Sequence, residues 1–219
     1  MHVFLIHGMG RSPVSMWGLA IRLRWAGYGA SLFGYSVTVE PLDSIAERFR
    51  RHIEGQLDGR EDRRYAVVGH SLGNIITRLA SPGLPAGFER FIMMAPPNRP
   101  PAVARELQDN PLFQLLTSDA GQRLCDDEFY ARLPMPPGVP ALVIAGNRGV
   151  RGAWHPLGEV ENDAVVSVEE TWVEGVPQVI VSGIHSFLMN RADVFSMIRR
   201  FLEDAEVEVP DGARIGDLV

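Results

Sequence analysis

Short apolar runs alternate with longer segments of helical periodicity along almost the whole chain, and this alternation limits the fold more than any other feature of the sequence. Six runs are expected to be buried strands, because they are short, mostly rich in branched or aromatic residues, and bounded by Gly or Pro. They are residues 2–6, 30–37, 64–68, 89–94, 141–145 and 178–181. Helices are expected in 16–26, 42–57, 72–79 and 192–205, and in several pieces within 102–133.

The fold class that this order predicts is α/β, with about six mostly parallel strands and helices on both faces of the sheet. The 219 residues fit one domain, 1–219, with no room for a large cap domain. The proline-rich stretch 96–137 is expected to be a lid or cap-like insertion, and 207–219 a polar tail. Because ligands bind beyond the carboxyl ends of parallel strands, residues of chemical interest should directly follow strands.

Composition excludes several classes of function. The net charge is −6 and the basic residues are interleaved with acidic ones, so no nucleic-acid partner is expected. Cys125 is the only cysteine, which rules out an intrachain disulfide and argues against a cysteine-based metal site. No apolar run reaches eighteen residues, and no signal peptide precedes the first strand. We therefore expect a cytoplasmic protein without a membrane span, with a secreted protein trimmed of its targeting segment as the alternative.

The motif Gly69-His70-Ser71-Leu72-Gly73 lies between the third predicted strand and a predicted helix. A tight strand–turn–helix connection of this kind lifts a serine hydroxyl above the sheet and turns the helix N-terminus toward developing negative charge. Glycines at both ends of the motif keep the turn free of clashes with neighbouring elements. The sequence therefore predicts that Ser71 is a nucleophile.

A serine nucleophile needs a general base, and the chain has six histidines. His185 follows the last predicted strand, precedes the last helix and comes after Ser71 in the chain, as this arrangement requires. Structural roles are expected for His2, His7, His52 and His70. His155 remains an alternative base, because its glycine-rich loop, 147–163, is long enough to approach the pocket.

The residue that orients the base should follow strand 141–145 and precede His185. Glu159, Glu161, Asp163, Glu169 and Glu170 all meet this condition. Asp163 is favoured, because the apolar residues Ala164-Val165-Val166 suggest a partly buried turn around it. Glu161 is the main alternative.

Attack on a carbonyl creates an oxyanion, which two backbone N–H groups must stabilise. One is expected from Leu72, directly after the nucleophile, and the other from Met9 in the loop His7-Gly8-Met9-Gly10. Trp154, Phe187 and Leu188 are expected near the mouth of the pocket and suggest an apolar acyl or alcohol group. Neither a metal ion nor an organic cofactor is implied.

The sequence resembles the bacterial esterase/lipase-like α/β-hydrolases, the compact lipases related to lipase class 2. The motifs that carry the resemblance are HGMGRS at 7–12, GHSLG at 69–73, MAPPN at 94–98, NDAVVSVE at 162–169 and HSFLM at 185–189. Position by position, the resemblance implies a Ser71–Asp163–His185 triad and an oxyanion hole at Met9 and Leu72. Two positions depart from the family pattern, since Ala164 and Asn74 stand where glycine is usual.

These observations together predict a serine hydrolase that cleaves carboxylic esters through an acyl-enzyme on Ser71. The expected partner is a small ester or lipid, with at most transient contact with a lipid interface. The same triad also serves amidases, thioesterases and acyltransferases, and a catalytically silent binding protein is the alternative from another class. The sequence gives no prediction of the oligomeric state or of the natural substrate.

Overall fold

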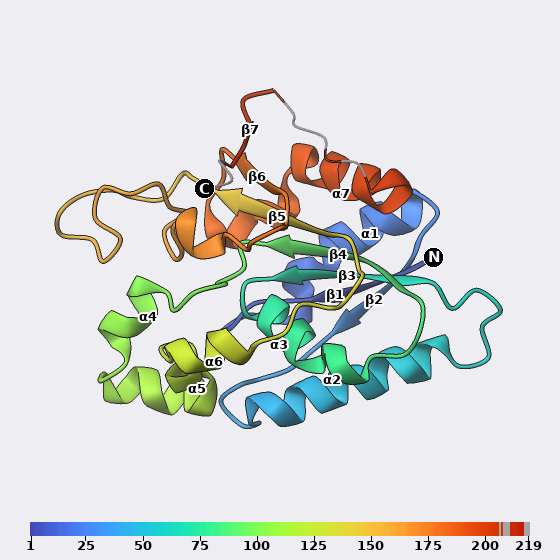
Figure 1. The fold of residues 1–219 in the computed structure, drawn as a ribbon, viewed down its shortest axis with the longest axis horizontal. Helices are drawn as coiled ribbons and strands as arrows, with labels where there is room; N and C mark the ends of the chain where they lie inside the picture. Colours follow the sequence, from blue (N-terminus) through green and yellow to red (C-terminus); the bar gives the residue numbers. More distant parts are fainter. Residues whose placement is uncertain (206, 208–210, 217–219) are drawn as a thin grey trace.

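In the described part of the chain, seven strands form a single sheet in the order β2-β1-β3-β4-β5-β6-β7 (Figure 1). The computed structural model describes residues 1–205, 207 and 211–216. The strands are β1 (His2–Ile6), β2 (Gly29–Phe33), β3 (Tyr65–His70), β4 (Phe88–Met94), β5 (Ala141–Gly146), β6 (Gln178–Val181) and β7 (Arg214–Ile215). Strands β1 to β6 are all parallel to their neighbours, and only β7 runs antiparallel, against β6. The predicted α/β class is therefore confirmed, with one additional short strand.

The strand expected at 30–37 ends at Phe33. Its register pairs Phe33 with Ile6, the last residue of β1, so no neighbouring strand is left to pair with the residues that follow. The additional strand β7 lies within the predicted tail 207–219, and residues 208–210 and 217–219 of that tail lie outside the described part of the chain. Both residues of β7 are exposed.

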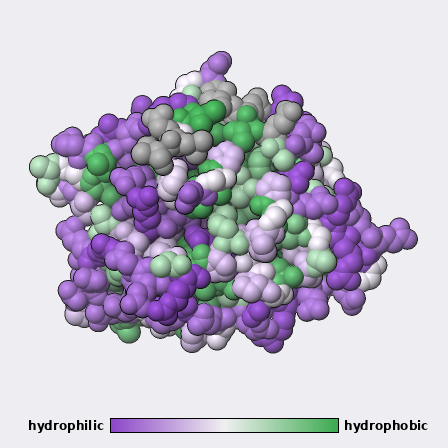
Figure 2. All heavy atoms as spheres, in the orientation of Figure 1, coloured by the Kyte–Doolittle hydropathy of each residue, from purple (hydrophilic) through white to green (hydrophobic). Residues whose placement is uncertain are grey.

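Helices cover the two faces of the sheet and enclose two cores. On one face, α2 (Leu42–Leu57) and α3 (Leu72–Ala80) pack against Phe4, Ile6 and Val67. On the other face, α1 (Trp17–Trp25) and α7 (Ala192–Asp204) pack against Val3 and Leu5. Alternate residues of β1 thus enter different cores, as the period of two in a strand requires. Figure 2 shows hydrophilic side chains over most of the face turned to the viewer, with smaller hydrophobic areas between them.

Three further helices, α4 (Ala102–Leu107), α5 (Pro111–Arg123) and α6 (Asp127–Arg132), lie between β4 and β5 in the chain. Helix α5 is interrupted at Ser118, whose φ of 49° and ψ of −135° are not helical. Figure 1 shows these helices and the 147–163 loop on the side to which the arrows of β3, β4 and β5 point. Both predicted loop regions therefore flank the carboxyl edge of the sheet, while the motion expected of a lid stays a prediction.

Among the described residues, no helix has the length and apolar character needed to cross a bilayer.

Candidate active site

Ser71 occupies the sharp turn between β3 and α3. Its φ of 51° and ψ of −123° lie outside the regions that non-glycine residues ordinarily adopt. Such strain persists where the surrounding structure enforces it, and it is frequent at reaction centres. The Ser71 N–H donates to the carbonyl of Met94 at 2.9 Å, so the turn is also fixed to the end of β4. This is the conformation that a nucleophile elbow requires, and Ser71 is the N-cap of α3.

The glycines of the motif are required by close packing. A Cβ atom on Gly73 would lie 2.6 Å from the carbonyl oxygen of Ile6 and 2.8 Å from that of His7, and both are backbone atoms. A Cβ atom on Gly69 would lie 2.2 Å from Oδ1 of Asn74. The sequence argument for glycine at these two positions therefore agrees with the geometry of the turn.

Asn74 is completely buried and stands where the resemblance led us to expect glycine. Its Nδ2 donates to the carbonyl of Ser71 at 3.0 Å and to the carbonyl of Met94 at 3.2 Å. The side chain thus joins the elbow to β4, and Gly69 leaves the space that it fills. Asn74 therefore adds two hydrogen bonds to the turn at the position where the family pattern has glycine.

Asp163 and His185 form a buried pair beyond the carboxyl ends of β5 and β6. Nδ1 of His185 donates to Oδ2 of Asp163 at 2.7 Å, and the His185 N–H donates to the Asp163 carbonyl at 2.9 Å. The other carboxylate oxygen accepts from the N–H groups of Val165 and Val166 at 3.0 and 2.9 Å. Asp163 is fully buried and His185 is 7 % exposed. This contact fixes the tautomer of His185 and leaves its Nε2 free to act as a base.

Ala164 adopts a φ of 86°, within the region that favours glycine. The next two N–H groups, those of Val165 and Val166, donate to the Asp163 carboxylate, which explains why the chain turns so sharply at this position. The glycine that the family pattern favours here is thus explained by backbone conformation. Ala164 takes the same conformation at some cost in strain.

The backbone N–H groups expected to form the oxyanion hole have no acceptor within the described part of the chain. Leu72 is the first residue of α3, where an N–H has no partner inside the helix. Met9 lies in the turn after β1, which the hydrogen bond from the Arg11 N–H to the Gly8 carbonyl closes. A Cβ atom on Gly8 would lie 2.9 Å from Cβ of Ser71, so this turn lies against the elbow.

His70 joins the elbow to the base without taking part in the pair. Its ring is buried, 4.8 Å from the ring of His185, and its Nε2 donates to the His185 carbonyl at 2.9 Å. Burial is the main cause that lowers the pKa of His70 well below its ordinary value. A neutral His70, directly before Ser71 in the chain, therefore keeps the Ser71 turn next to His185.

His7 also has a structural environment. Its ring stacks on Tyr35 at 4.3 Å, and its Nδ1 donates to the Gly8 carbonyl at 2.8 Å. Burial lowers the pKa of His7. Both histidines next to the motif glycines are thus packed and hydrogen-bonded, as the sequence suggested.

The alternative base and acid have their contacts elsewhere. Nδ1 of His155 accepts from the Leu157 N–H within its own loop. Glu161 pairs with Arg214 and, at 3.6 Å, with Arg151. Neither His155 nor Glu161 contacts the Asp163–His185 pair through any of these interactions.

The residues expected to bind substrate are found in different environments. Leu188 is completely buried in the core beside α1 and α7, so its side chain is unavailable to a ligand. Phe187 is 54 % exposed and Trp154 is 76 % exposed. Of the three, Phe187 lies nearest in sequence to His185, two residues away in the same short helix η4 (His185–Asn190).

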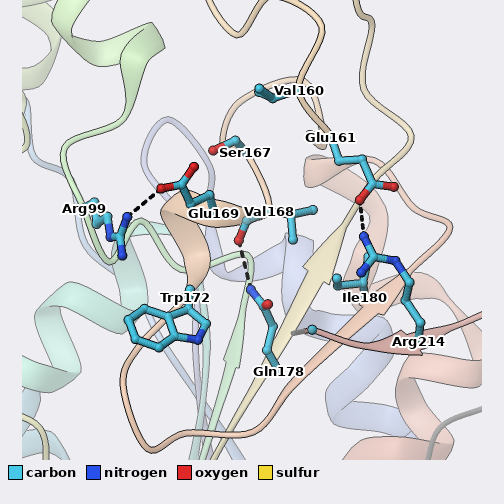
Figure 3. A pocket seen from close by; sticks show the side chains of 11 residues that line it. Arg99, Val160, Glu161, Ser167, Val168, Glu169, Trp172, Gln178, Ile180 and Arg214 are labelled. Carbon is cyan, nitrogen blue, oxygen red and sulfur yellow. Dashed lines mark hydrogen bonds and ion pairs between the residues drawn. The ribbon is translucent and has the colours of Figure 1, made fainter. Parts of the chain in front are cut away.

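A cavity of about 610 Å³ is lined by residues of the 160–180 region together with Arg99 and Arg214 (Figure 3). Its wall includes Trp172 and Ile180, and the ion pairs Arg99–Glu169 and Glu161–Arg214 lie at its rim. Neither Ser71 nor Asp163 nor His185 lines it. This cavity is therefore distinct from the candidate reaction centre.

The described residues contain no group of three His, Cys, Asp or Glu side chains arranged to hold a metal ion. Two buried polar residues, Arg78 and Asn98, hydrogen-bond to each other at 3.0 Å, and the sequence predicted no role for either side chain. An arginine within a helix is ordinarily exposed, so no sequence signal marked Arg78.

The chain belongs to the alpha/beta hydrolase family, whose model matches residues 3–214. No curated protein sequence matches significantly. Among solved structures, the mature form of the Bacillus licheniformis lipase BlEst2 is similar with a TM-score of 0.67 and 18% identity, over 92% of this chain and 90% of that one.

Two other structures share the fold. The phospholipase PlaB from Legionella pneumophila has a TM-score of 0.63 and 21% identity, over 78% of this chain and 45% of that one. A putative thioesterase from a Silicibacter species has a TM-score of 0.61 and 15% identity, over 90% of this chain and 75% of that one. At these identities the likeness concerns the fold, and the family assignment supports a hydrolase.

Proposed function

We propose that this protein is a serine hydrolase that cleaves carboxylic esters, with Ser71 as nucleophile, His185 as general base and Asp163 as the residue that orients the base. The N–H groups of Met9 and Leu72 form the oxyanion hole. The observation that carries this proposal is the buried Asp163–His185 pair at the carboxyl edge of the sheet that also bears the Ser71 elbow.

The reaction proceeds by two acyl transfers. Nε2 of His185 takes the proton of the Ser71 hydroxyl as its oxygen attacks the ester carbonyl, and the carbonyl oxygen becomes an oxyanion between the two N–H donors. The C–O bond to the alcohol then breaks, and His185 returns the proton to the departing alcohol. Water repeats the sequence on the acyl-enzyme, which releases the acid and restores Ser71.

The described residues show no hydrogen bond between the Ser71 hydroxyl and His185. In enzymes with this mechanism, the contact between nucleophile and base is often long and tightens in the complex with substrate. The elbow, the orienting pair and the unoccupied N–H donors support the assignment without that contact.

Labelling with a fluorophosphonate, followed by peptide mass spectrometry, tests the proposal directly. The wild type is expected to carry the label on Ser71, and Ser71→Ala is expected to carry none. Ser118→Ala is the matched control, because Ser118 is exposed and has almost the same backbone conformation, with φ 49° and ψ −135°. Loss of label in the control, or an unlabelled but folded wild type, would contradict an activated Ser71.

A panel of an ester, a thioester and an amide with the same acyl group then tests the substrate class. We expect the ester to have the highest kcat/KM. A higher value for the thioester or the amide would replace ester hydrolysis as the proposed reaction while leaving the three catalytic roles unchanged.

A further inference from the structure

Arg78 is a buried arginine whose hydrogen-bond partners are all neutral oxygen atoms. It lies in the last turn of α3 and is 6 % exposed. Burial lowers the pKa of its guanidinium to about 10, so it keeps its positive charge at neutral pH. Burying a charge without an ionic partner is costly, and here hydrogen bonds to oxygen atoms compensate for part of the cost.

The partners of Arg78 come from both ends of the chain segment that contains α4, α5 and α6. Its NH1 donates to Oδ1 of Asn98, ahead of α4, at 3.0 Å. Its Nε donates to the Pro134 carbonyl at 3.0 Å, and its NH2 donates to the Leu133 carbonyl, both beyond α6. One side chain of α3 thus joins the two ends of the segment 99–132 by hydrogen bonds.

The same hydrogen bonds continue toward the catalytic acid. Nδ2 of Asn98 donates to the carbonyl of Thr171 at 2.7 Å, and the Asn98 N–H donates to the Glu170 carbonyl at 2.8 Å. Oε1 of Glu170 accepts from the Ala102 N–H at 2.7 Å, at the start of α4. Its Oε2 accepts from the Ser167 N–H, also at 2.7 Å.

Ser167 in turn belongs to the turn that carries Asp163. Ser167 pairs with Asn162 in an isolated antiparallel bridge, and the Asp163 N–H donates to the Val166 carbonyl at 3.0 Å. A continuous set of hydrogen bonds therefore runs from α3, past the two ends of the segment 99–132, to the Asp163 turn. Helix α3 begins at Leu72, which is proposed as an oxyanion donor.

We propose that Arg78 is a positioning residue that, through Asn98 and Glu170, holds the α4–α6 segment and the Asp163 turn in one fixed arrangement. This inference rests on the proposed function in that Asp163 is taken as the acid of the triad. A network of buried polar groups whose members are all paired specifies one arrangement, and removal of one member leaves several groups unpaired.

We call the hydrogen-bonded set formed by Arg78, Asn98 and Glu170 the brace. Hydrogen exchange of the intact protein tests the brace independently of activity. Arg78→Met is expected to raise exchange about tenfold or more both in 102–132 and in 162–168. Arg90→Met is the control, because Arg90 also donates to two carbonyls, those of Glu89 and Phe201, but joins β4 to α7. Exchange that rises in 162–168 no more than in this control would overturn the proposal.

Glu170→Gln provides a second and milder variant, which decides the question if Arg78→Met does not fold. Glu170→Gln is expected to raise exchange in 162–168 and at the start of α4 by a few-fold, because a neutral amide is a weaker acceptor and brings an N–H₂ donor toward an N–H group. The neighbouring Glu169→Gln is the control, since Glu169 is exposed and pairs with Arg99.

Ester kinetics give the functional readout. Loosening the Asp163 turn is expected to lower kcat for a short-chain ester about tenfold in Arg78→Met, with a smaller change in KM, whereas Arg90→Met keeps both values. If KM alone changes, the effect is on substrate binding rather than on the Asp163 turn, and the link to the acid is refuted. A wild type that neither labels nor hydrolyses esters would refute the proposed function, while the exchange data would still decide the brace.

Discussion

The two oxygen atoms of the Asp163 carboxylate have different tasks. Oδ1 accepts the N–H groups of Val165 and Val166, and Oδ2 accepts the proton of His185 Nδ1. The first pair of bonds shapes the turn, and the third selects the tautomer of the base. A substitution that keeps the shape of the Asp163 side chain and its Oδ1 atom should therefore preserve folding while it changes catalysis.

Asp163→Asn is expected to lower kcat for esters roughly 10³- to 10⁴-fold, because an amide N–H₂ toward His185 favours the wrong tautomer. Circular dichroism and the urea midpoint should show a folded protein. Glu161→Gln is the matched control and should retain activity, since Glu161 pairs with exposed arginines of its own neighbourhood. Loss of activity in Glu161→Gln with an active Asp163→Asn would exchange the two assignments.

Among single residues, the candidate site residues that directly follow strands could be predicted from the sequence. Ser71 and His185 were placed by the strands before them, and Asp163 by the apolar residues after it. The brace residues Arg78 and Glu170 gave no such signal, because their role depends on carbonyl and N–H groups that only the folded chain brings near them. Leu188 was misjudged as a lining residue because an apolar residue near a predicted site is as readily core as pocket.

At the scale of elements, the β3–α3 unit has little tolerance for added volume. A Cβ atom on Gly73 meets two backbone carbonyls of the β1 end, and backbone atoms cannot rotate away. By contrast, Gly55 lies on the exposed side of α2 with open space around it. The same substitution at these two helical glycines should therefore have opposite effects.

Gly73→Ala is expected to lower the free energy of unfolding by about 1–3 kcal/mol and to reduce Ser71 labelling, because overpacking displaces the elbow from the end of β1. Gly55→Ala is expected to raise the free energy of unfolding by about 0.5–1 kcal/mol and to leave Ser71 labelling unchanged. Urea unfolding of both variants measures the difference. A Gly73→Ala protein as stable as the wild type would show that the turn has room that its geometry does not indicate.

Element boundaries were predictable where burial alone decides them, as for β1 and β6. They were less so where a neighbour decides them: β2 stops at Phe33 because β1 stops at Ile6. Strand β7 has two exposed residues and no apolar alternation, so its sequence lacks the usual signal of a strand. The break of α5 at Ser118 likewise has no glycine or proline to announce it.

For the whole molecule, four histidines are held in conditions that favour the neutral ring. Burial is the largest cause in each case, and it lowers the pKa of His2 to about 4 and the pKa values of His7, His52 and His70 below their ordinary range. Below pH 6.5 the unfolded chain takes up protons at these rings before the folded protein does. The unfolded state then binds more protons, so acid favours unfolding.

We expect the free energy of unfolding to be highest above pH 6.5 and to fall steadily as the pH decreases toward 4. Urea titrations at several pH values in this window measure the slope. His2→Gln should show a shallower slope than the wild type, because one of the contributing rings is gone. A slope that is flat in the wild type between pH 6.5 and 4.5 would contradict the neutral state of these histidines in the folded protein.

The two-residue strand β7 also determines how much of the outer edge of β6 is open to pairing with another chain. It pairs Ile215 with Val179 and Arg214 with Ile180, and so covers the outer side of β6, a strand buried along its whole length. Without that cover, β6 would present a row of unpaired N–H and C=O groups, which is a template for adding a strand from another chain. A chain shortened before Arg214 should therefore aggregate edge to edge, even though every residue proposed for catalysis is still in place.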